Sequence, residues 1–505
     1  MSQLLPHAPR VELRAGAAAL HDRILAAADA AVILLPATDA QARLASLPRP
    51  ELWRTLYRSG KRASADPILS ARLPNARSTL VAVGFVKPAS STFQHLQLAG
   101  KLLREVGKPG VANLQLHAAG LPPSQRTTAL EALASAALAA AAPMPDRRTK
   151  QPRGSDLRRV VIAGGQGLDL DAVAAAAEGN HLARWLAMLP PNELDSLAYR
   201  RVLRSLATRE GWGFRFYDER SLKRLGAGAF LAVTRANAHR GAGIVRLRHR
   251  PAGRAGRKLA LVGKGICFDT GGINLKAHRG MYLMHGDMQG SAVAVGTLLA
   301  LARRRIPVAV DCWLAITENE TGPLAYRPQE VVRAVNGVTI QVVHSDAEGR
   351  MVLADTLALA AREHPSLLLD FATLTGACVN ALTERYSGVF TNRPELHDAL
   401  QRVGRTSGER VWCFPMDEDY DSDLESPIAD VLQCALEGKG DHILAARFLS
   451  RFVPGDLPWV HMDLSSSERK GGLAHVPTEF TGFGVRYATQ LLTDAQFLAS
   501  LDRLR

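Results

Sequence analysis

The sequence predicts an α/β protein with a smaller N-terminal α/β domain, residues 1–175, and a larger C-terminal α/β domain, residues 176–505. Two observations support this prediction. A chain of 505 residues is too long for a single hydrophobic core. Short apolar runs also alternate with helix patterns, which is typical of α/β folds. We therefore expect a mostly parallel or mixed central sheet in the larger domain.

The smaller N-terminal part of the chain contains three apolar runs that are typical of strands. Two of them, residues 29–37 and 79–86, are almost continuously apolar, as buried strands are. A helix pattern follows at 93–105, and an Ala-rich stretch at 127–142 strongly favours a second helix. The run VVIAGG then predicts a return to the sheet.

The larger C-terminal part begins with a long helix pattern that ends at Pro190 and Pro191, which places the domain junction near residues 170–180. After it, apolar strand patterns alternate with helix patterns. The expected strands are 259–262, 308–315, 367–371 and 460–464, and the expected helices are 291–304 and 352–363. This order predicts that several strands of the larger sheet run parallel.

The bulk composition is that of a globular protein, with 47% apolar and 22% charged residues. No uninterrupted apolar run reaches the length of a membrane span, and the first residues lack the apolar region of a secretory signal. The five cysteines are scattered and form no CxxC pair. We therefore expect reduced thiols, a cytoplasmic location and no structural zinc knuckle.

The positive charge is concentrated at the front of the chain. Residues 1–170 carry a formal charge of +11, whereas the remainder carries +3. A solvated basic surface is the simpler interpretation. The alternative is a nucleic-acid-binding regulator that uses the N-terminal domain, although no helix-turn-helix pattern is present.

Three segments place polar residues directly after expected strands. The residues are Lys264, Asp269, Lys276 and Asp287 in the first segment, Asp346, Glu348 and Arg350 in the second, and Thr373, Leu374, Thr375 and Gly376 in the third. Sites in open α/β sheets form at the carboxyl ends of strands. We therefore expect these segments to meet.

The second segment has charged residues at every second position. If this part of the chain is extended, Asp346, Glu348 and Arg350 share one face just before a helix.

Four carboxylates in one place would repel one another and raise each other's pKa unless cations joined them. Two bridged divalent ions resolve this conflict, and oxygen-rich ligands suit zinc, manganese or magnesium. The alternatives are solvated surface acids or a phosphate loop. The sequence GKGICFDTGG satisfies neither GxxxxGK[ST] nor GxGxxG, so phosphate binding is disfavoured.

Several blocks resemble the leucine aminopeptidase family of dinuclear metallo-exopeptidases. They are VGKGICFDTGG, GDM, ENETGPLAYRPQEVV, SDAEGRMVLADTL and FATLTGAC, which match in order and spacing over about residues 180–390. The resemblance implies release of N-terminal amino acids from peptides, with a leucine-like preference. It also implies a homo-hexamer that binds two divalent ions per subunit.

The resemblance also assigns roles to individual residues. It implies that Asp269 and Glu348 bridge the two metals, that Asp346 binds one metal, and that Lys264 and Asp287 bind the other. Lys276 is expected to polarise the scissile carbonyl. Arg350 is expected to hold bicarbonate as proton shuttle with help from the backbone of Leu374, and Met284, Thr373 and Gly376 to contact the substrate.

Two departures from the family pattern affect specificity more than chemistry. His344 stands where the family usually has asparagine. The usual Gly-rich stretch is replaced by LEGKGDHILAARFLSRF, which introduces Glu437, Lys439, Asp441 and His442. A catalytically silent scaffold is a further alternative, but it predicts missing ligands, and all the expected positions are occupied.

Overall fold

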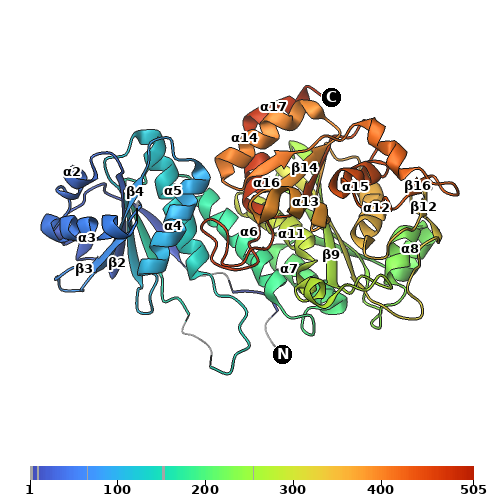
Figure 1. The fold of residues 1–505 in the computed structure, drawn as a ribbon, viewed down its shortest axis with the longest axis horizontal. Helices are drawn as coiled ribbons and strands as arrows, with labels where there is room; N and C mark the ends of the chain where they lie inside the picture. Colours follow the sequence, from blue (N-terminus) through green and yellow to red (C-terminus); the bar gives the residue numbers. More distant parts are fainter. Residues whose placement is uncertain (1–3, 8–10, 65, 151–153, 254, 505) are drawn as a thin grey trace.

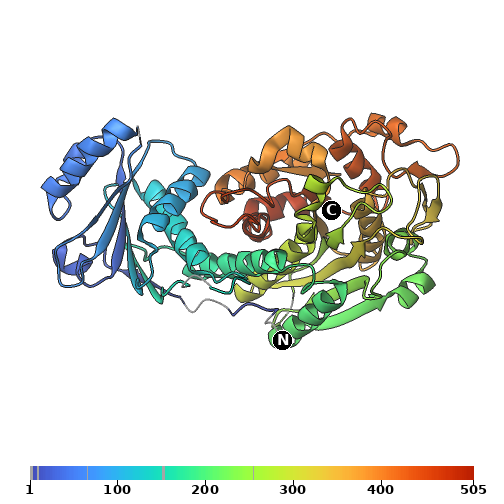
Figure 2. The ribbon, with the colours of Figure 1, turned by 60° about the horizontal axis from the view of Figure 1, so that its bottom comes forward.

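The computed structural model describes residues 4–7, 11–64, 66–150, 154–253 and 255–504. Two lobes of unequal size lie side by side along the long axis of the molecule (Figures 1 and 2). Each lobe is built on its own sheet with helices packed against it. The expected fold, a smaller N-terminal and a larger C-terminal α/β unit, is confirmed.

The smaller lobe contains a six-stranded sheet in the order β1-β6-β5-β2-β4-β3. Only β3 pairs antiparallel with its neighbour. The strands are β1 (Glu12–Gly16), β2 (Ala30–Pro36), β3 (Leu69–Arg72), β4 (Leu80–Val86), β5 (Asn113–Ala118) and β6 (Arg159–Ala163). Alternate residues of β2 face two different cores, so both faces of this strand are buried. This burial explains its continuous apolar sequence.

The larger lobe contains an eight-stranded sheet in the order β15-β14-β17-β13-β9-β10-β8-β7. Its centre, β17-β13-β9-β10, is parallel, while β7 and β8 add antiparallel pairs at one edge, so the sheet is mixed as expected. The strands are β7 (Gly213–Asp218), β8 (Gly243–His249), β9 (Arg257–Asp269), β10 (Val308–Asn319), β13 (Leu367–Ala372), β14 (Ser387–Thr391), β15 (Val411–Cys413) and β17 (Trp459–Asp463). A small sheet joins β11 (Val331–Arg333), β12 (Thr339–Gln341) and β16 (Val431–Leu432).

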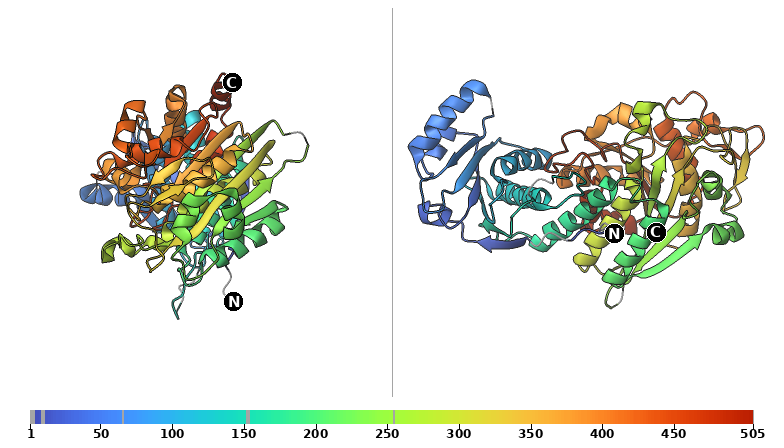
Figure 3. Two further views of the ribbon diagram at one scale, coloured as in Figure 1. Left: turned by 90° about the vertical axis from the view of Figure 1, so that its right-hand side faces the viewer. Right: turned by 90° about the horizontal axis from the view of Figure 1, so that it is seen from below.

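Helices cover both faces of the larger sheet (Figure 3). Leu259 and Leu261 of β9 belong to the core formed with α11 (Gln289–Arg303), whereas Ala260 and Val262 belong to the core formed with α12 (Glu348–Ala361). This alternation directs successive side chains of β9 to opposite faces. The other helices are α1 (Asp22–Leu25), α2 (Ala40–Leu44), α3 (Pro50–Ala63), α4 (Thr92–Val106), α5 (Pro123–Ala141), α7 (Ser196–Glu210), α8 (Glu219–Leu225), α9 (Gly228–Thr234), α10 (His278–Met281), α13 (Gly376–Leu382), α14 (His397–Ser407), α15 (Asp441–Ser450), α16 (Val485–Leu491) and α17 (Ala495–Asp502).

Helix α6 (Leu170–Met188) lies between the two lobes and packs against both α5 and α11. The approach to α11 is close, because a methyl group at Gly179 would lie 2.3 Å from the carbonyl oxygen of Gly296. The boundary expected between residues 175 and 176 falls inside this helix and stays a prediction. Within the described ranges, no helix is long and apolar enough to cross a bilayer. The five cysteines are free, as expected.

Candidate metal centre

The polar residues after the central strands meet at the carboxyl edge of the larger sheet. Lys264 lies within β9 and Asp269 ends it, Asn319 ends the neighbouring β10, and Thr373 follows β13 on the other side. Parallel strands direct their carboxyl ends to one edge of the sheet, so these side chains are brought together by topology.

Three carboxylates form the centre of this cluster. Asp269, Asp346 and Glu348 each place one oxygen within 4.8 Å of the other two. Asp269 and Glu348 are buried and Asp346 is half-buried. The buried Asp287, which follows the short helix η1 (Met284–Gly286), joins them as the fourth acid.

Two lysines lie between the four acids. Lys264 Nζ is 2.9 Å from Asp287 Oδ2 and 2.9 Å from Glu348 Oε1. Lys276 Nζ is 2.9 Å from Asp269 Oδ2 and 2.5 Å from Asp346 Oδ1. Each ammonium group therefore neutralises a different pair of carboxylates, and the sequence prediction that these residues converge holds in the structure.

The segment before α12 differs from the expectation of an extended chain. Asp346 lies in a turn, and α12 begins at Glu348, four residues before the expected helix. Asp346 and Glu348 reach the same cluster, but Arg350 diverges and binds Asp441. The prediction that the three charged residues share one face was therefore wrong for Arg350, because α12 begins at Glu348 and this part of the chain is not extended.

Close approach between α12 and β9 requires a small residue at position 349. A methyl group at Gly349 would lie 2.7 Å from Lys264 Nζ. Lys264 Nζ is fixed at this place because it also donates a hydrogen bond to the carbonyl oxygen of Thr373 at 2.9 Å.

A glycine turn after β9 brings Lys276 back to the acids. Gly271 has a φ of +86°, a conformation that favours glycine, and its N–H donates to Asp269 Oδ1 at 2.9 Å. A side chain there would also approach Asp346 Oδ1 to 3.0 Å. Gly271 is therefore a structural requirement of the cluster.

Burial dominates the electrostatics of the acids. It raises the pKa of Asp287 and of Glu348 to about 7, against the opposing effect of Lys264, and it raises the pKa of Asp346 to about 6. Burial lowers the pKa of Lys264 and of Lys276, but the surrounding carboxylates outweigh it and raise both. Lys264 therefore becomes a neutral ligand only if cations replace its proton.

The donor set fits divalent cations. Glu348 Oε2 is buried and has no hydrogen-bond partner among the described residues, and an orphaned buried carboxylate oxygen is costly. The cluster supplies oxygen ligands from four acids and one amine, a set that suits zinc, manganese or magnesium.

Two supporting residues were missed by the sequence reasoning. Asn319 Nδ2 donates to Asp269 Oδ1 at 2.8 Å and to the carbonyl oxygen of Ser345 at 3.0 Å. Tyr326 donates to the same carbonyl oxygen at 2.7 Å. Asn319 pairs in register with Asp269, so a polar residue at the end of a neighbouring strand was the available signal.

The two residues expected to hold an anion both contact carboxylates of this chain. Arg350 Nη2 donates to Asp441 Oδ1 and Oδ2, both at 2.8 Å. The N–H of Leu374 donates to Asp463 Oδ1 at 3.2 Å. The role of either residue toward bicarbonate stays a prediction.

The residues expected to contact substrate lie around the cluster at different depths. Thr373 Oγ1 donates to Asp287 Oδ1 at 2.6 Å, so it orients a candidate ligand. Met284 is half-buried at the start of η1, and Gly376 is exposed at the start of α13. Their contacts with substrate remain predictions.

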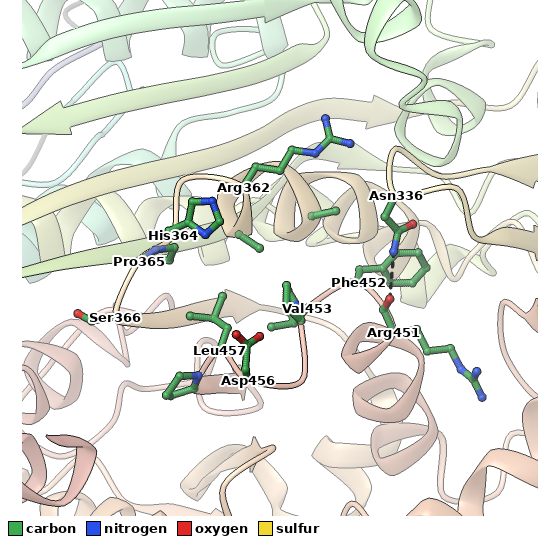
Figure 4. A pocket seen from close by; sticks show the side chains of 14 residues that line it. Asn336, Arg362, His364, Pro365, Ser366, Arg451, Phe452, Val453, Asp456 and Leu457 are labelled. Carbon is green, nitrogen blue, oxygen red and sulfur yellow. Dashed lines mark hydrogen bonds between the residues drawn. The ribbon is translucent and has the colours of Figure 1, made fainter. Parts of the chain in front are cut away.

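A separate pocket of about 640 Å³ lies elsewhere on the larger lobe (Figure 4). Its lining includes Arg362 and His364, which follow α12, and the segment 451–458, and Asn336 Nδ2 donates to the carbonyl oxygen of Arg451 at 3.1 Å. Ser366 and Pro458 precede β13 and β17, so this pocket adjoins the amino ends of strands. It is at the opposite edge of the sheet from the acids.

An α/β sheet covered by helices on both faces, with ligands for divalent cations gathered at its carboxyl edge, is the arrangement of a metal-dependent enzyme. The model of the cytosol aminopeptidase family, catalytic domain, matches residues 181–489, and the chain belongs to this family. It is therefore a metallo-aminopeptidase, and the relatives below agree with this assignment.

Relatives match over most of the chain. A probable cytosol aminopeptidase of Syntrophotalea carbinolica is 38% identical over 435 residues, 84% of this chain and 86% of that protein. One of Rhodopseudomonas palustris (strain BisB18) is 35% identical over 429 residues, 82% and 84% of the two chains.

The fold is also similar to solved structures over most of the chain. The bottromycin maturation enzyme BotP in complex with Mn is 29% identical with a TM-score of 0.80, covering 92% of this chain and 99% of BotP. A mutant of tomato leucine aminopeptidase is 25% identical with a TM-score of 0.82, covering 96% and 97% of the two chains.

Proposed function

We propose that the protein releases N-terminal amino acids, preferably leucine-like ones, from peptides by means of a water held between two divalent ions. The observation that carries this proposal is the placement of Lys264 and Lys276 between four converging carboxylates. Such a cluster supplies ligands for two cations and leaves one lysine for the substrate. Zinc and manganese are the favoured ions, and magnesium is the alternative.

The ligand assignment follows the family resemblance. Lys264 and Asp287 hold one ion, Asp346 holds the other, and Asp269 and Glu348 are shared. The oxygens of Asp269, Asp346 and Glu348 are close enough together to support sharing. When bound, the ions supply a water of lowered pKa and a Lewis acid for the carbonyl group.

The chain's own residues position these ligands and the substrate. Asn319 fixes one oxygen of Asp269, and Thr373 fixes one oxygen of Asp287. The Lys276 side chain is 17% exposed, so part of it reaches solvent at the cluster. Once cations neutralise the acids that now hold it, Lys276 donates to the carbonyl oxygen of the scissile peptide as negative charge develops there.

Specificity for the first residue rests on groups outside the ligand set. The proposal places Met284, Thr373 and Gly376 around the first side chain or the substrate backbone. The exposed His344 accepts a hydrogen bond from the N–H of Asp346 at its Nδ1, which puts its ring beside the acids. His344 is therefore the residue whose replacement should change peptide preference.

The resemblance supports two further features of the proposal, a homo-hexamer and a cytoplasmic location. The bicarbonate that it implies beside Arg350 would have to take the place that Asp441 holds on that guanidinium. The hexamer is tested by light scattering on the metal-loaded protein, where a monomeric mass would contradict it.

Hydrolysis of short peptides tests the proposed activity. Metal-stripped protein refilled with zinc, manganese or magnesium is assayed on Leu-, Met-, Arg- and Cys-Gly-type substrates and on the same peptides with an acetylated N-terminus. We expect Leu and Met peptides to be cleaved fastest and acetylated ones not at all. Equal cleavage of free and acetylated peptides would overturn the exopeptidase assignment.

Nucleic-acid binding through the N-terminal region is a second candidate, supported by its charge of +11. Retention of the full chain on a generic DNA duplex should then fall steeply as salt rises. Absence of retention at low salt would exclude this candidate and leave the peptidase proposal unaffected.

A further inference from the structure

Arg350 is a buried cation whose partner comes from a distant part of the chain. Its side chain is 2% exposed. Nη2 donates to both oxygens of Asp441 at 2.8 Å, and Nη1 donates to the carbonyl oxygen of Gln433 at 3.2 Å. A buried guanidinium requires such an anion, because an uncompensated charge in the interior is costly.

The segment that leads to Asp441 is hydrogen-bonded to the segment that carries Asp346. The Gln433 side chain accepts the N–H groups of Val343 and His344, both at 3.0 Å, and donates to the carbonyl oxygen of Ala347 at 3.1 Å. Asp441 then begins α15, directly after Gly440. The contact with Arg350, two residues after Glu348, holds Asp441 beside this region.

Asp441 also reaches solvent. Its side chain is 24% exposed, unlike the guanidinium that it binds. The family resemblance expects the proton-carrying anion to lie on Arg350, and Asp441 holds that guanidinium with both of its oxygens.

We propose that Asp441 is the resident anion of Arg350, and that its carboxylate carries the proton during hydrolysis in place of external bicarbonate. This inference rests on the proposed peptidase function. An external anion would have to displace Asp441 from Nη2 and would also meet Leu374 already donating to Asp463. Glu437, in the same segment, pairs instead with Lys439 at an exposed position.

The proposed step conserves atoms and charge. The Asp441 carboxylate accepts one proton from the attacking water as the new C–O bond forms. The resulting carboxylic acid returns that proton to the leaving nitrogen as the C–N bond breaks. Asp441 is then ionised again, and the products are a free amino acid and the shortened peptide.

Two substitutions separate this role from simple support of Arg350. Asp441→Gly removes the carboxylate and opens its space, whereas Asp441→Asn fills the space without a group that exchanges protons. Glu437→Gln is the matched control in the same segment. All are assayed on a Leu-terminated chromogenic substrate in carbonate-free buffer and then with added bicarbonate. Metal content and binding of ¹³C-labelled bicarbonate by NMR are also measured.

We expect wild type and Glu437→Gln to turn over equally fast with and without bicarbonate, and to bind none at Arg350. Asp441→Gly should keep its metals and lose kcat by about 100-fold. Added bicarbonate should bind to it and restore at least a tenth of the wild-type rate. Asp441→Asn should lose kcat similarly and should not recover, because the amide fills the site.

Three results would overturn the inference. They are a wild-type rate that depends on bicarbonate, an Asp441→Gly rate equal to wild type, and an Asp441→Gly variant that neither binds nor responds to bicarbonate. If no variant or wild type cleaves peptides, the proposed function fails instead. In that case the NMR titration still tests whether Asp441 is the resident anion of Arg350. If it is, bicarbonate binds to Asp441→Gly and does not bind to wild type.

Discussion

Lys264 Nζ lies 2.9 Å from Glu348 Oε1, and the two side chains are only 4% and 1% exposed. The pair joins a central strand to the helix that covers it. Breaking such a pair by removing one partner leaves an uncompensated buried charge, at a cost of about 3–5 kcal/mol. The proposed function makes the same two side chains ligands of cations, so substitutions at this pair should affect both folding stability and activity.

Loss of a shared ligand should abolish metal binding. Glu348→Ala and Asp269→Ala each remove an oxygen assigned to both ions, so metal content measured by mass spectrometry should drop below one ion per chain. Activity should fall by more than about 100-fold, since even residues that only orient ligands are worth 10- to 100-fold. Full metal content and rate in Glu348→Ala would show that the ligand assignment is wrong.

Loss of Lys276 should separate binding from turnover. Lys276→Ala is expected to keep both ions, because this residue is assigned to the substrate and not to a metal. Its kcat should drop by about 10²–10³-fold, the range measured for removal of one oxyanion donor. A variant that loses ions in proportion to its rate would instead make Lys276 part of the metal site.

The close contact at Gly349 gives a steric test. In Gly349→Ala the new methyl group lies 2.7 Å from Lys264 Nζ, which must then move away from Asp287 and Glu348. We expect one of the two ions to bind at least about 10-fold more weakly, as measured by metal titration. Gly455→Ala is the matched control, because a methyl group there meets nothing within 4 Å. Equal metal affinity in both variants would contradict the placement of Lys264.

The fold and most of the site could be predicted from local sequence signals. The apolar runs of β2 and β4 predicted strands correctly, because both faces of these strands are buried. Lys264, Asp269 and Glu348 were expected to converge because their segments were placed at the ends of expected strands, and the three side chains do converge. The blocks that resemble one family supplied the roles, which spacing alone left open.

Long-range contacts could not be predicted in the same way. Nothing local to Arg350 indicates that its guanidinium reaches Asp441, and charge alternation suggested a shared face with Asp346 and Glu348 instead. The early start of α12 turns Arg350 away, and the replacement of a Gly-rich stretch supplies the acid that meets it. Asn319 was missed for a similar reason, since its role depends on strand register.

A buried acid that is not part of the acid cluster predicts a pH dependence of stability. Burial raises the pKa of Glu409 to about 7, although the N–H groups of Tyr487 and Gly484 donate to its Oε2 and oppose the shift. The folded-state pKa is therefore above the unfolded one, so the contribution of Glu409 to stability is greatest at low pH and declines as pH rises toward 7.

Glu409→Gln should remove this dependence, because its amide keeps an acceptor oxygen and does not ionise. The free energy of unfolding of wild type minus that of the variant is expected to fall by about 2 kcal/mol between pH 5 and pH 8. Denaturant titrations of both proteins at the two pH values measure this difference. A difference that stays constant would mean that Glu409 is ionised, or neutral, over the whole range.

Direct observation of the cations is the most decisive measurement. Crystals of the protein loaded with manganese, with anomalous scattering recorded, should reveal two ions contacted by Asp269, Asp287, Asp346, Glu348 and Lys264, with Lys276 released toward the substrate side. Crystals in which both lysines retain their ion pairs and no anomalous signal lies between these acids would contradict the account.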